Sequence, residues 1–145
     1  MASTYTEIAE IPEGWIDPVD NGILTSLCSA RTNPILGKAE YHNGIDIAAE
    51  EGSNVYAVRN GTVTNIHYSE TYGNVLTIET KDGYKIIYNH LQKIFPEINE
   101  PVIQGEIIAL VGKTGLSTGP HLHYTVYLND MLMDPLQFTT YKSDA

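Results

Sequence analysis

The chain has 145 residues and a formal net charge of −10, with 18 Asp plus Glu against 8 Lys plus Arg. This length suits one domain with a sizeable core, and the excess of acidic groups argues against partners with phosphate backbones, so we expect no nucleic-acid binding. The single cysteine, Cys28, rules out an internal disulfide, and no run of 18 apolar residues is present to span a membrane.

The N-terminal residues 1–20 are polar and lack a sustained hydrophobic period, so we predict an arm with a few anchoring residues such as Trp15. Residues 1–14 lack the basic start and the apolar stretch of a signal peptide. We therefore expect either a protein that stays inside the cell or a piece of a longer exported chain. The predicted folded domain covers 21–138, and a C-terminal tail covers 139–145.

From residue 22 on, short apolar runs are interrupted by Gly, Asn and Asp, a pattern typical of an all-β domain. The pair Asp82-Gly83 between two β-rich runs is a strong hairpin signal. No segment shows an amphipathic helix, and 34–42 and 92–99 are predicted to be loops. The predicted strands are 54–58, 62–68, 75–80, 84–90, 107–111 and 122–128.

The last predicted strand carries two histidines on one face. Side chains alternate along a strand, so Leu122 and its even-numbered neighbours face one way, and the other face presents His121, His123, Thr125 and Tyr127. The wholly apolar opposite face anchors this strand, and the turn at 115–120 fixes where it begins. The alternative is a pair of polar residues on a solvent-exposed face.

Two further histidines are candidates for chemistry. His42 and Asp46 lie four residues apart on a loop that runs into a strand, and a catalytic zinc site uses three such ligands with one position open. An Asx-turn with an incidental histidine is the alternative for this pair. His90 ends the predicted strand 84–90, in which Tyr84, Ile86, Tyr88 and His90 share a face, and a surface histidine is its alternative. We assign no role to His67.

Other metal-binding and phosphate-binding motifs are absent or incomplete in this sequence. The His-Glu-x-x-His motif is absent, and the upstream glycine that a P-loop would need before Gly112-Lys113-Thr114 is Ile107. The pair His121 and His123 also resembles the start of a cupin metal site, but the glutamate expected shortly afterwards is missing. Cys28 is expected to be a small core residue.

Taken together, these segments resemble the lysostaphin-type (LytM-like) zinc metalloendopeptidases that hydrolyse peptidoglycan. His42-Asn43-Gly44-Ile45-Asp46 is similar to the first metal motif of that family, and Tyr88-Asn89-His90-Leu91 is similar to its Tyr-x-His-Leu block. The segment 115–124, Gly-Leu-Ser-Thr-Gly-Pro-His-Leu-His-Tyr, resembles its most specific signature. The resemblance covers about 22 to 138. One departure is Thr125, which stands where an acidic residue is common.

The resemblance implies a compact, mainly antiparallel, sandwich-like β-sheet domain with an active-site groove and little or no helix. It implies a zinc ion held by His42, Asp46 and His123, with His90 and His121 as the two catalytic histidines. The implied substrate is a stem peptide or cross-bridge of peptidoglycan. The implied location is outside the cytoplasm, in the cell wall, at the cell surface or secreted.

Two alternatives to a peptidase are a scaffold, which the same resemblance allows, and an unrelated domain of similar β fold. Some members of the family have lost ligands and act as scaffolds or binding modules in cell-envelope or sporulation assemblies, so a cell-envelope protein is a possible partner. All five matching positions are filled here, which favours the enzyme. A sugar-transport phosphocarrier domain would need a phosphorylatable histidine and no zinc. Because the acidic chain gains little attraction to an anionic wall, we expect a membrane anchor or wall-binding module outside this chain.

Overall fold

The computed structural model describes residues 14–32 and 39–141, and gives the side chains of 14–28 and 43–141. In chain order the described elements are β1 (Ile23–Ser26), β2 (Ser29–Thr32), β3 (Ala39–His42), β4 (Ile45–Ala48), β5 (Asn54–Tyr56), β6 (Gly61–Ser69), β7 (Gly73–Glu79), β8 (Tyr84–Ile94), β9 (Pro101–Val102), β10 (Ile107–Val111), β11 (His121–Leu128), β12 (Met131–Met133) and the 3-10 helix η2 (Pro135–Phe138).

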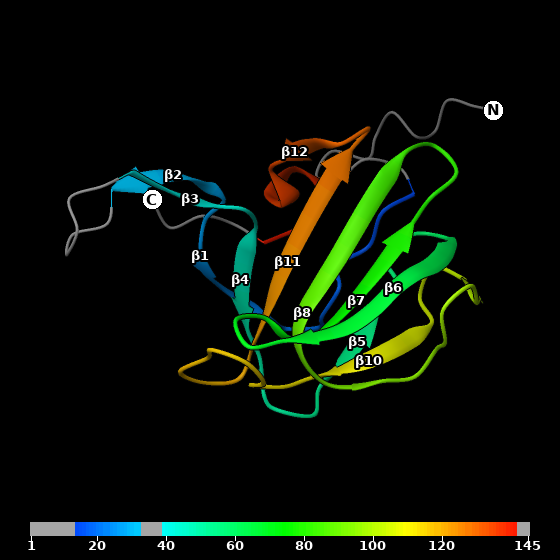
Figure 1. The fold of residues 1–145 in the computed structure, drawn as a ribbon, viewed down its shortest axis with the longest axis horizontal. Coiled ribbons are helices and arrows are strands. Elements are labelled where there is room, and N and C mark those ends of the chain that lie inside the picture. The colour runs from blue at the N-terminus through cyan, green and yellow to red at the C-terminus, as the bar shows by residue number, and fades with distance from the viewer. Residues whose placement is uncertain (1–13, 33–38, 142–145) are drawn as a thin grey trace.

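One ten-stranded sheet dominates the described part of the chain, and its strands pair antiparallel in the order β1-β4-β11-β8-β7-β6-β9. Outside this path β12 pairs with β11, and β10 pairs with both β5 and β8. Figure 1 shows β11, β8, β7 and β6 side by side as a broad twisted surface. The predicted all-β, mainly antiparallel fold is therefore confirmed.

Two predicted loops are partly strand. β8 continues to Ile94, beyond the predicted end at His90, because its last residues pair with β10. Ala39–His42 forms β3, which pairs with β2 in a separate two-stranded sheet. Both errors have one cause. Each segment becomes a strand because another strand pairs with it, and the composition of the segment itself does not reveal that partner.

Alternation gives the large sheet one apolar and one polar face. The side chains of the apolar face are fully buried and form the core; they include Ile45, Ile47, Leu76, Ile78, Ile86, Tyr88, Leu122, Tyr124 and Val126. The residues between them in sequence therefore face the other way, and they include Asp46, Thr77, Asn89, His123 and Thr125. The burial of the apolar face fixes the register, so it also fixes which polar side chains meet on the opposite face.

The N-terminal segment that the structure describes packs on this domain. Trp15 is buried and stacks on Phe138 of η2, with ring centroids 4.3 Å apart, while Tyr84 meets it edge-on at 5.0 Å. Residues 1–13 and 142–145, which belong to the predicted arm and tail, lie outside the described residues. The division at 20 and 138 stays a prediction.

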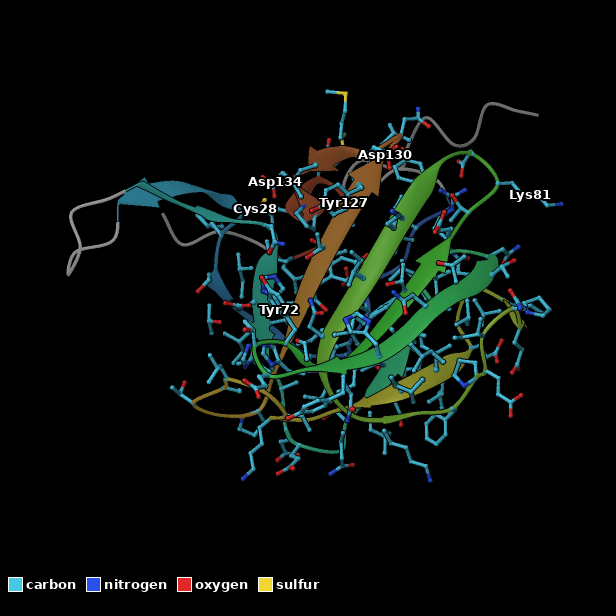
Figure 2. The ribbon with its side chains drawn as sticks, in the orientation of Figure 1. Cys28, Tyr72, Lys81, Tyr127, Asp130 and Asp134 are labelled. Carbon is cyan, nitrogen blue, oxygen red and sulfur yellow. The ribbon has the colours of Figure 1, made fainter. Side chains whose placement is uncertain are left out.

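Cys28 is half-buried and packs against the core, beside Asp134 (Figure 2). Burial, and to a lesser degree the negative charge of Asp134, raises the pKa of its thiol. The group is therefore kept as an unreactive thiol at neutral pH. In the described ranges, no helix is long and apolar enough to cross a membrane.

Two isoleucines test the assignment of the core. Ile78 is 1% exposed and Ile103 is 69% exposed. Replacing Ile78 with Ala should lower the free energy of unfolding by about 2–5 kcal/mol, because it removes buried methyl groups and leaves a cavity. The matched Ile103→Ala variant should change it by less than about 0.5 kcal/mol. Urea denaturation of both variants measures this, and equal losses would contradict the assignment.

Candidate functional site

The pairing of β11 with β4 brings the first two candidate residues together. His123 lies directly opposite Asp46 in this register, and His121 lies opposite Ala48. Residues opposite each other on one face have adjacent side chains. Accordingly, His123 Nδ1 lies 2.7 Å from Asp46 Oδ1, and His121 Nε2 lies 3.8 Å from the same oxygen.

His90 joins this group from β8 through an irregular backbone. Its φ is +65°, in the left-handed region that side chains other than glycine rarely adopt, and its N–H donates to the Tyr72 carbonyl at 2.7 Å. The pairing of β8 with β7 shifts register in the same region. His90 therefore leaves the face that it was predicted to share with Ile86 and Tyr88, and its ring lies 4.6 Å from that of His121.

Backbone carbonyls fix the tautomers of His90 and His121. His90 Nδ1 lies 2.7 Å from Thr114 O, and His121 Nδ1 lies 3.0 Å from Gly119 O. A carbonyl only accepts hydrogen bonds, so in both rings Nδ1 carries a hydrogen and donates. In the neutral ring Nε2 is then the basic nitrogen. Ser117 supports this arrangement, because its hydroxyl donates to Gly119 O at 2.6 Å and lies 3.1 Å from His121 Nδ1.

The ring of His123 is oriented the other way. Its Nδ1 faces Asp46, and its Nε2 lies 2.9 Å from the side-chain oxygen of Asn43. The side chain is 5% exposed, and Asn89 also holds the strand here by donating its amide to His123 O at 3.2 Å. In His123, therefore, Nδ1 faces the Asp46 carboxylate, whereas in His90 and His121 Nδ1 faces a backbone carbonyl.

Burial dominates the electrostatics of His90. Removal from water lowers the pKa of its ring, and the nearby His121 and His123 lower it further, while the Thr114 carbonyl and Asp46 act in the opposite direction. The lowered pKa favours the neutral ring at neutral pH. A neutral ring can accept a proton at Nε2, whereas a charged one cannot.

The donor atoms of Asp46 and His123 suit a zinc ion, which prefers carboxylate oxygen and imidazole nitrogen in a tetrahedral arrangement. The third predicted ligand, His42, ends β3 four residues before Asp46, but its side chain lies outside the described residues. Among the side chains that the structure describes, no three His, Cys, Asp or Glu form a metal-binding group. The structure thus brings together four of the five predicted site residues: Asp46, His90, His121 and His123.

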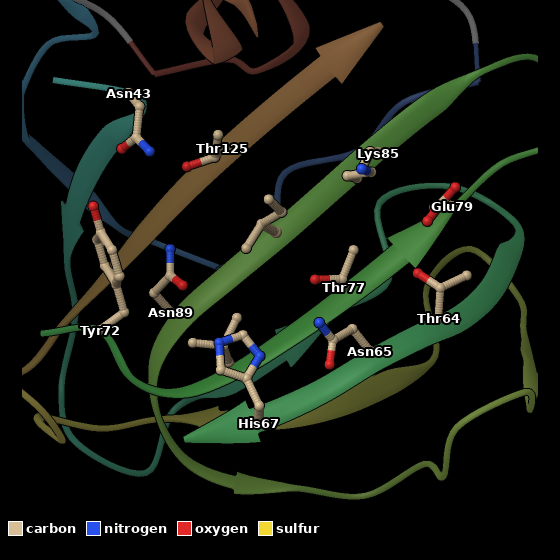
Figure 3. Close-up of a pocket in the computed structure, with 12 residues that line it drawn as sticks. Asn43, Thr64, Asn65, His67, Tyr72, Thr77, Glu79, Lys85, Asn89 and Thr125 are labelled. Carbon is tan, nitrogen blue, oxygen red and sulfur yellow. The ribbon is translucent and has the colours of Figure 1, made fainter. Parts of the chain in front are cut away.

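Two adjoining cavities open at this site. The smaller, of about 300 Å³, holds Asp46 and the three histidines beneath the 116–118 loop. The larger, of about 400 Å³, is a trough along the polar face of β6, β7, β8 and β11, shown in Figure 3. Asn43 and Tyr72 line both cavities, so the trough leads directly to the histidines.

Several lining residues were not predicted from the sequence. The Tyr72 ring lies 5.7 Å from that of His123 and 6.2 Å from that of His90. The Thr125 hydroxyl is buried and has no hydrogen-bond partner among the described residues. His67, to which no role was assigned, points into the trough in Figure 3. Only Thr125 could have been found, because it follows His121 and His123 on the same face of a predicted strand.

Comparison with known proteins agrees with this arrangement. Residues 40–135 match the family model of Peptidase family M23. The chain is 37% identical over 123 residues to the peptidoglycan DD-endopeptidase ShyB of Vibrio cholerae, and the match covers 83% of this chain and 29% of that protein. The chain therefore spans less than a third of that relative.

Solved structures show the same fold. A zinc-containing peptidase from Vibrio cholerae aligns with a TM-score of 0.81 and 34% identity, over 91% of this chain and 40% of that one. The catalytic domain of lysostaphin from Staphylococcus simulans aligns with a TM-score of 0.71 and 29% identity, over 82% of this chain and 92% of that one.

The positive φ of His90 can be tested by comparing the free energies of unfolding of Gly and Ala variants at this position. At this position Gly should be more stable than Ala by about 1 kcal/mol, since only Gly adopts the left-handed region without strain. At Asn89, which is not among the residues of positive φ, Ala should be more stable than Gly by about 0.5–1 kcal/mol. Urea denaturation of the four variants decides the matter, and Ala ahead of Gly at both positions would argue against strain at His90.

Proposed function

Because the chain belongs to peptidase family M23, we propose that it is a zinc-dependent endopeptidase that hydrolyses peptide bonds in the stem peptides or cross-bridges of peptidoglycan. Membership of this family confirms the lysostaphin-type resemblance. One observation carries the proposal: His123 turns Nδ1 toward Asp46, whereas His90 and His121 hold Nδ1 on carbonyls and keep Nε2 for proton transfer. A set of surface histidines would have no reason to adopt these two opposite orientations.

In this proposal Asp46 and His123, together with His42, would hold the metal. Bound zinc would supply a Lewis acid that polarises the scissile carbonyl and lowers the pKa of water at the site. Two neutral imidazoles and one carboxylate leave a net positive charge there, and three protein ligands leave one position open.

His90 and His121 would move the protons. Their rings lie 4.6 Å apart, so both can reach one scissile peptide. One neutral ring accepts a proton at Nε2 from the attacking water. The other ring, in its protonated form with a hydrogen on Nε2 as well as on Nδ1, donates to the oxyanion or gives that proton to the leaving amine. Because the Nδ1 hydrogens are held by Thr114 O and Gly119 O, neither ring needs to rotate during the reaction.

The trough suits a peptide with little apolar surface, such as the glycine-rich or D-residue-rich peptides of peptidoglycan. Its floor has a short apolar strip of Val75 and Ile87, surrounded by the amides and hydroxyls of Asn89, Thr77 and Thr125. The unpartnered Thr125 hydroxyl lacks a hydrogen bond that a substrate amide or carbonyl could supply. The trough would therefore hold the peptide backbone beside the scissile bond.

The cellular setting is part of the same proposal. A peptidoglycan substrate implies that the domain works outside the cytoplasm. Because the domain is strongly acidic, an anionic wall would attract it little, so another element, such as a membrane anchor or wall-binding module, would bring it to the wall. A non-catalytic scaffold with a cell-envelope partner is the alternative function. Loss of site residues would favour it, but Asp46, His90, His121 and His123 are all present and oriented.

Variants of the site separate metal binding from proton transfer. Asp46→Ala and His123→Ala should lose both zinc and activity, because each removes a ligand. His121→Ala should keep zinc and lose about 10²- to 10⁴-fold in rate, the usual contribution of a general acid or base. Zinc is measured by chelator competition, and activity by mass spectrometry of digested peptidoglycan beside a chelated sample. Zinc binding without new peptide-bond products from any peptidoglycan would favour the scaffold.

A variant of Thr125 tests whether the trough binds the substrate. Thr125→Val keeps the shape and removes the hydroxyl, so a lost substrate hydrogen bond should lower kcat/KM about 2- to 10-fold, mainly through KM. The free energy of unfolding should stay equal or rise, because a buried unpaired hydroxyl disappears. The control is Thr62→Val, which is exposed and lies outside the trough. An unchanged KM in the Thr125 variant would remove this residue from substrate binding.

A further inference from the structure

Asn43 occupies a fixed place beside His123. It follows β3 and precedes β4, and its side-chain oxygen lies 2.9 Å from His123 Nε2, across 80 residues of sequence. The next residue, Gly44, is buried against β11. A Cβ atom there would lie 2.4 Å from the carbonyl oxygen of Tyr124 and 2.7 Å from the Thr125 hydroxyl. Only glycine permits this approach, so the connection between β3 and β4 holds Asn43 against the histidine.

The chemistry of the two atoms decides the state of the ring. An amide oxygen accepts and cannot donate, so the hydrogen bond requires a hydrogen on His123 Nε2. Asp46 Oδ1, 2.7 Å from Nδ1, is also an acceptor and draws the hydrogen of a neutral ring to Nδ1, so the two partners favour opposite tautomers. The form with Nε2–H, which Asn43 favours, is the one that keeps a lone pair on Nδ1 for a metal. Without an acceptor at Nε2, the neutral ring could carry its hydrogen on either nitrogen, and the form with Nδ1–H cannot bind a metal through Nδ1.

We propose that Asn43 is a positioning residue that favours the Nε2–H tautomer of His123 over the Nδ1–H form that Asp46 favours, and thereby raises the zinc affinity of the site. The inference rests on the metal centre of the proposed function, but not on hydrolysis. Groups that hold the second nitrogen of a metal-binding histidine contribute about 10- to 100-fold to metal affinity in other proteins. Asn43 Oδ1 lies at Nε2 of His123, much as the carbonyls of Thr114 and Gly119 lie at Nδ1 of His90 and His121.

Zinc affinity of the purified chain, measured by competition with a chromophoric chelator, tests the proposal. Asn43→Leu, which has nearly the same shape and no acceptor, should bind zinc about 10- to 100-fold more weakly. Asn43→Asp keeps the acceptor oxygen and should bind it within a few-fold of the parent. The matched control is Asn65→Leu, on the rim of the same trough. Parental affinity in Asn43→Leu, or an equal loss in Asn43→Asp and Asn43→Leu, would overturn the proposal.

Nitrogen-15 NMR of the zinc-loaded chain provides a readout that a general loss of packing would not mimic. The parent and Asn43→Asp should show a His123 Nε2–H signal that exchanges slowly with water, and Asn43→Leu should show fast exchange at that position. A hydrogen on Nδ1 of the parent would overturn the proposal. Thermal unfolding of the metal-free variants checks the fold, and Asn43→Ala replaces Asn43→Leu if the latter does not fold.

These measurements need no substrate, so the two proposals fail separately. If zinc affinity depends on Asn43 but no peptidoglycan is cut, the endopeptidase proposal fails and the positioning role stands. If peptidoglycan is cut and Asn43→Leu binds zinc like the parent, the positioning role fails and the endopeptidase stands.

Discussion

The antiparallel register between β4 and β11 is the constraint on which the rest of the site depends. Ile45, Ile47, Leu122 and Tyr124 are fully buried on one face, so neither strand can slip by one residue without exposing its apolar side chains. The same register places Asp46 opposite His123 on the other face. The hydrophobic core thus positions two polar residues that take no part in it, and the distance between their reactive atoms follows from ordinary strand geometry.

Around this pair, each histidine is oriented by a different partner. His90 depends on Thr114, His121 on the turn that contains Ser117 and Gly119, and His123 on Asn43. These partners come from two connections that are far apart in sequence, the one between β10 and β11 and the one between β3 and β4. The site is therefore a meeting point of loops held by a rigid sheet, an arrangement in which loop residues supply orientation and strands supply spacing.

The sequence predicts those parts of the site that local periodicity determines. The faces of β11 follow from alternation alone: Leu122 and Tyr124 lie in the core, and His123 faces Asp46 on the other side, although it is buried as well. His90 could not be placed in this way, because its positive φ interrupts the alternation of β8 and no glycine or asparagine at that position signals it. Asn43 and Tyr72 escaped prediction for a different reason: their contacts join segments whose proximity depends on strand order, which composition does not reveal. The proposed metal and catalytic roles rest on the family resemblance rather than on periodicity.

The long sequence separation within the site has a thermodynamic consequence. Asp46 and His123 are 77 residues apart along the chain, yet their side chains are in contact. An unfolded chain keeps Asp46 and His123 apart, so the folded chain alone brings both donors to one metal. Any free energy of metal binding at this site is therefore also free energy of folding, and cellular metal supply would act on the lifetime of the folded protein as well as on its chemistry.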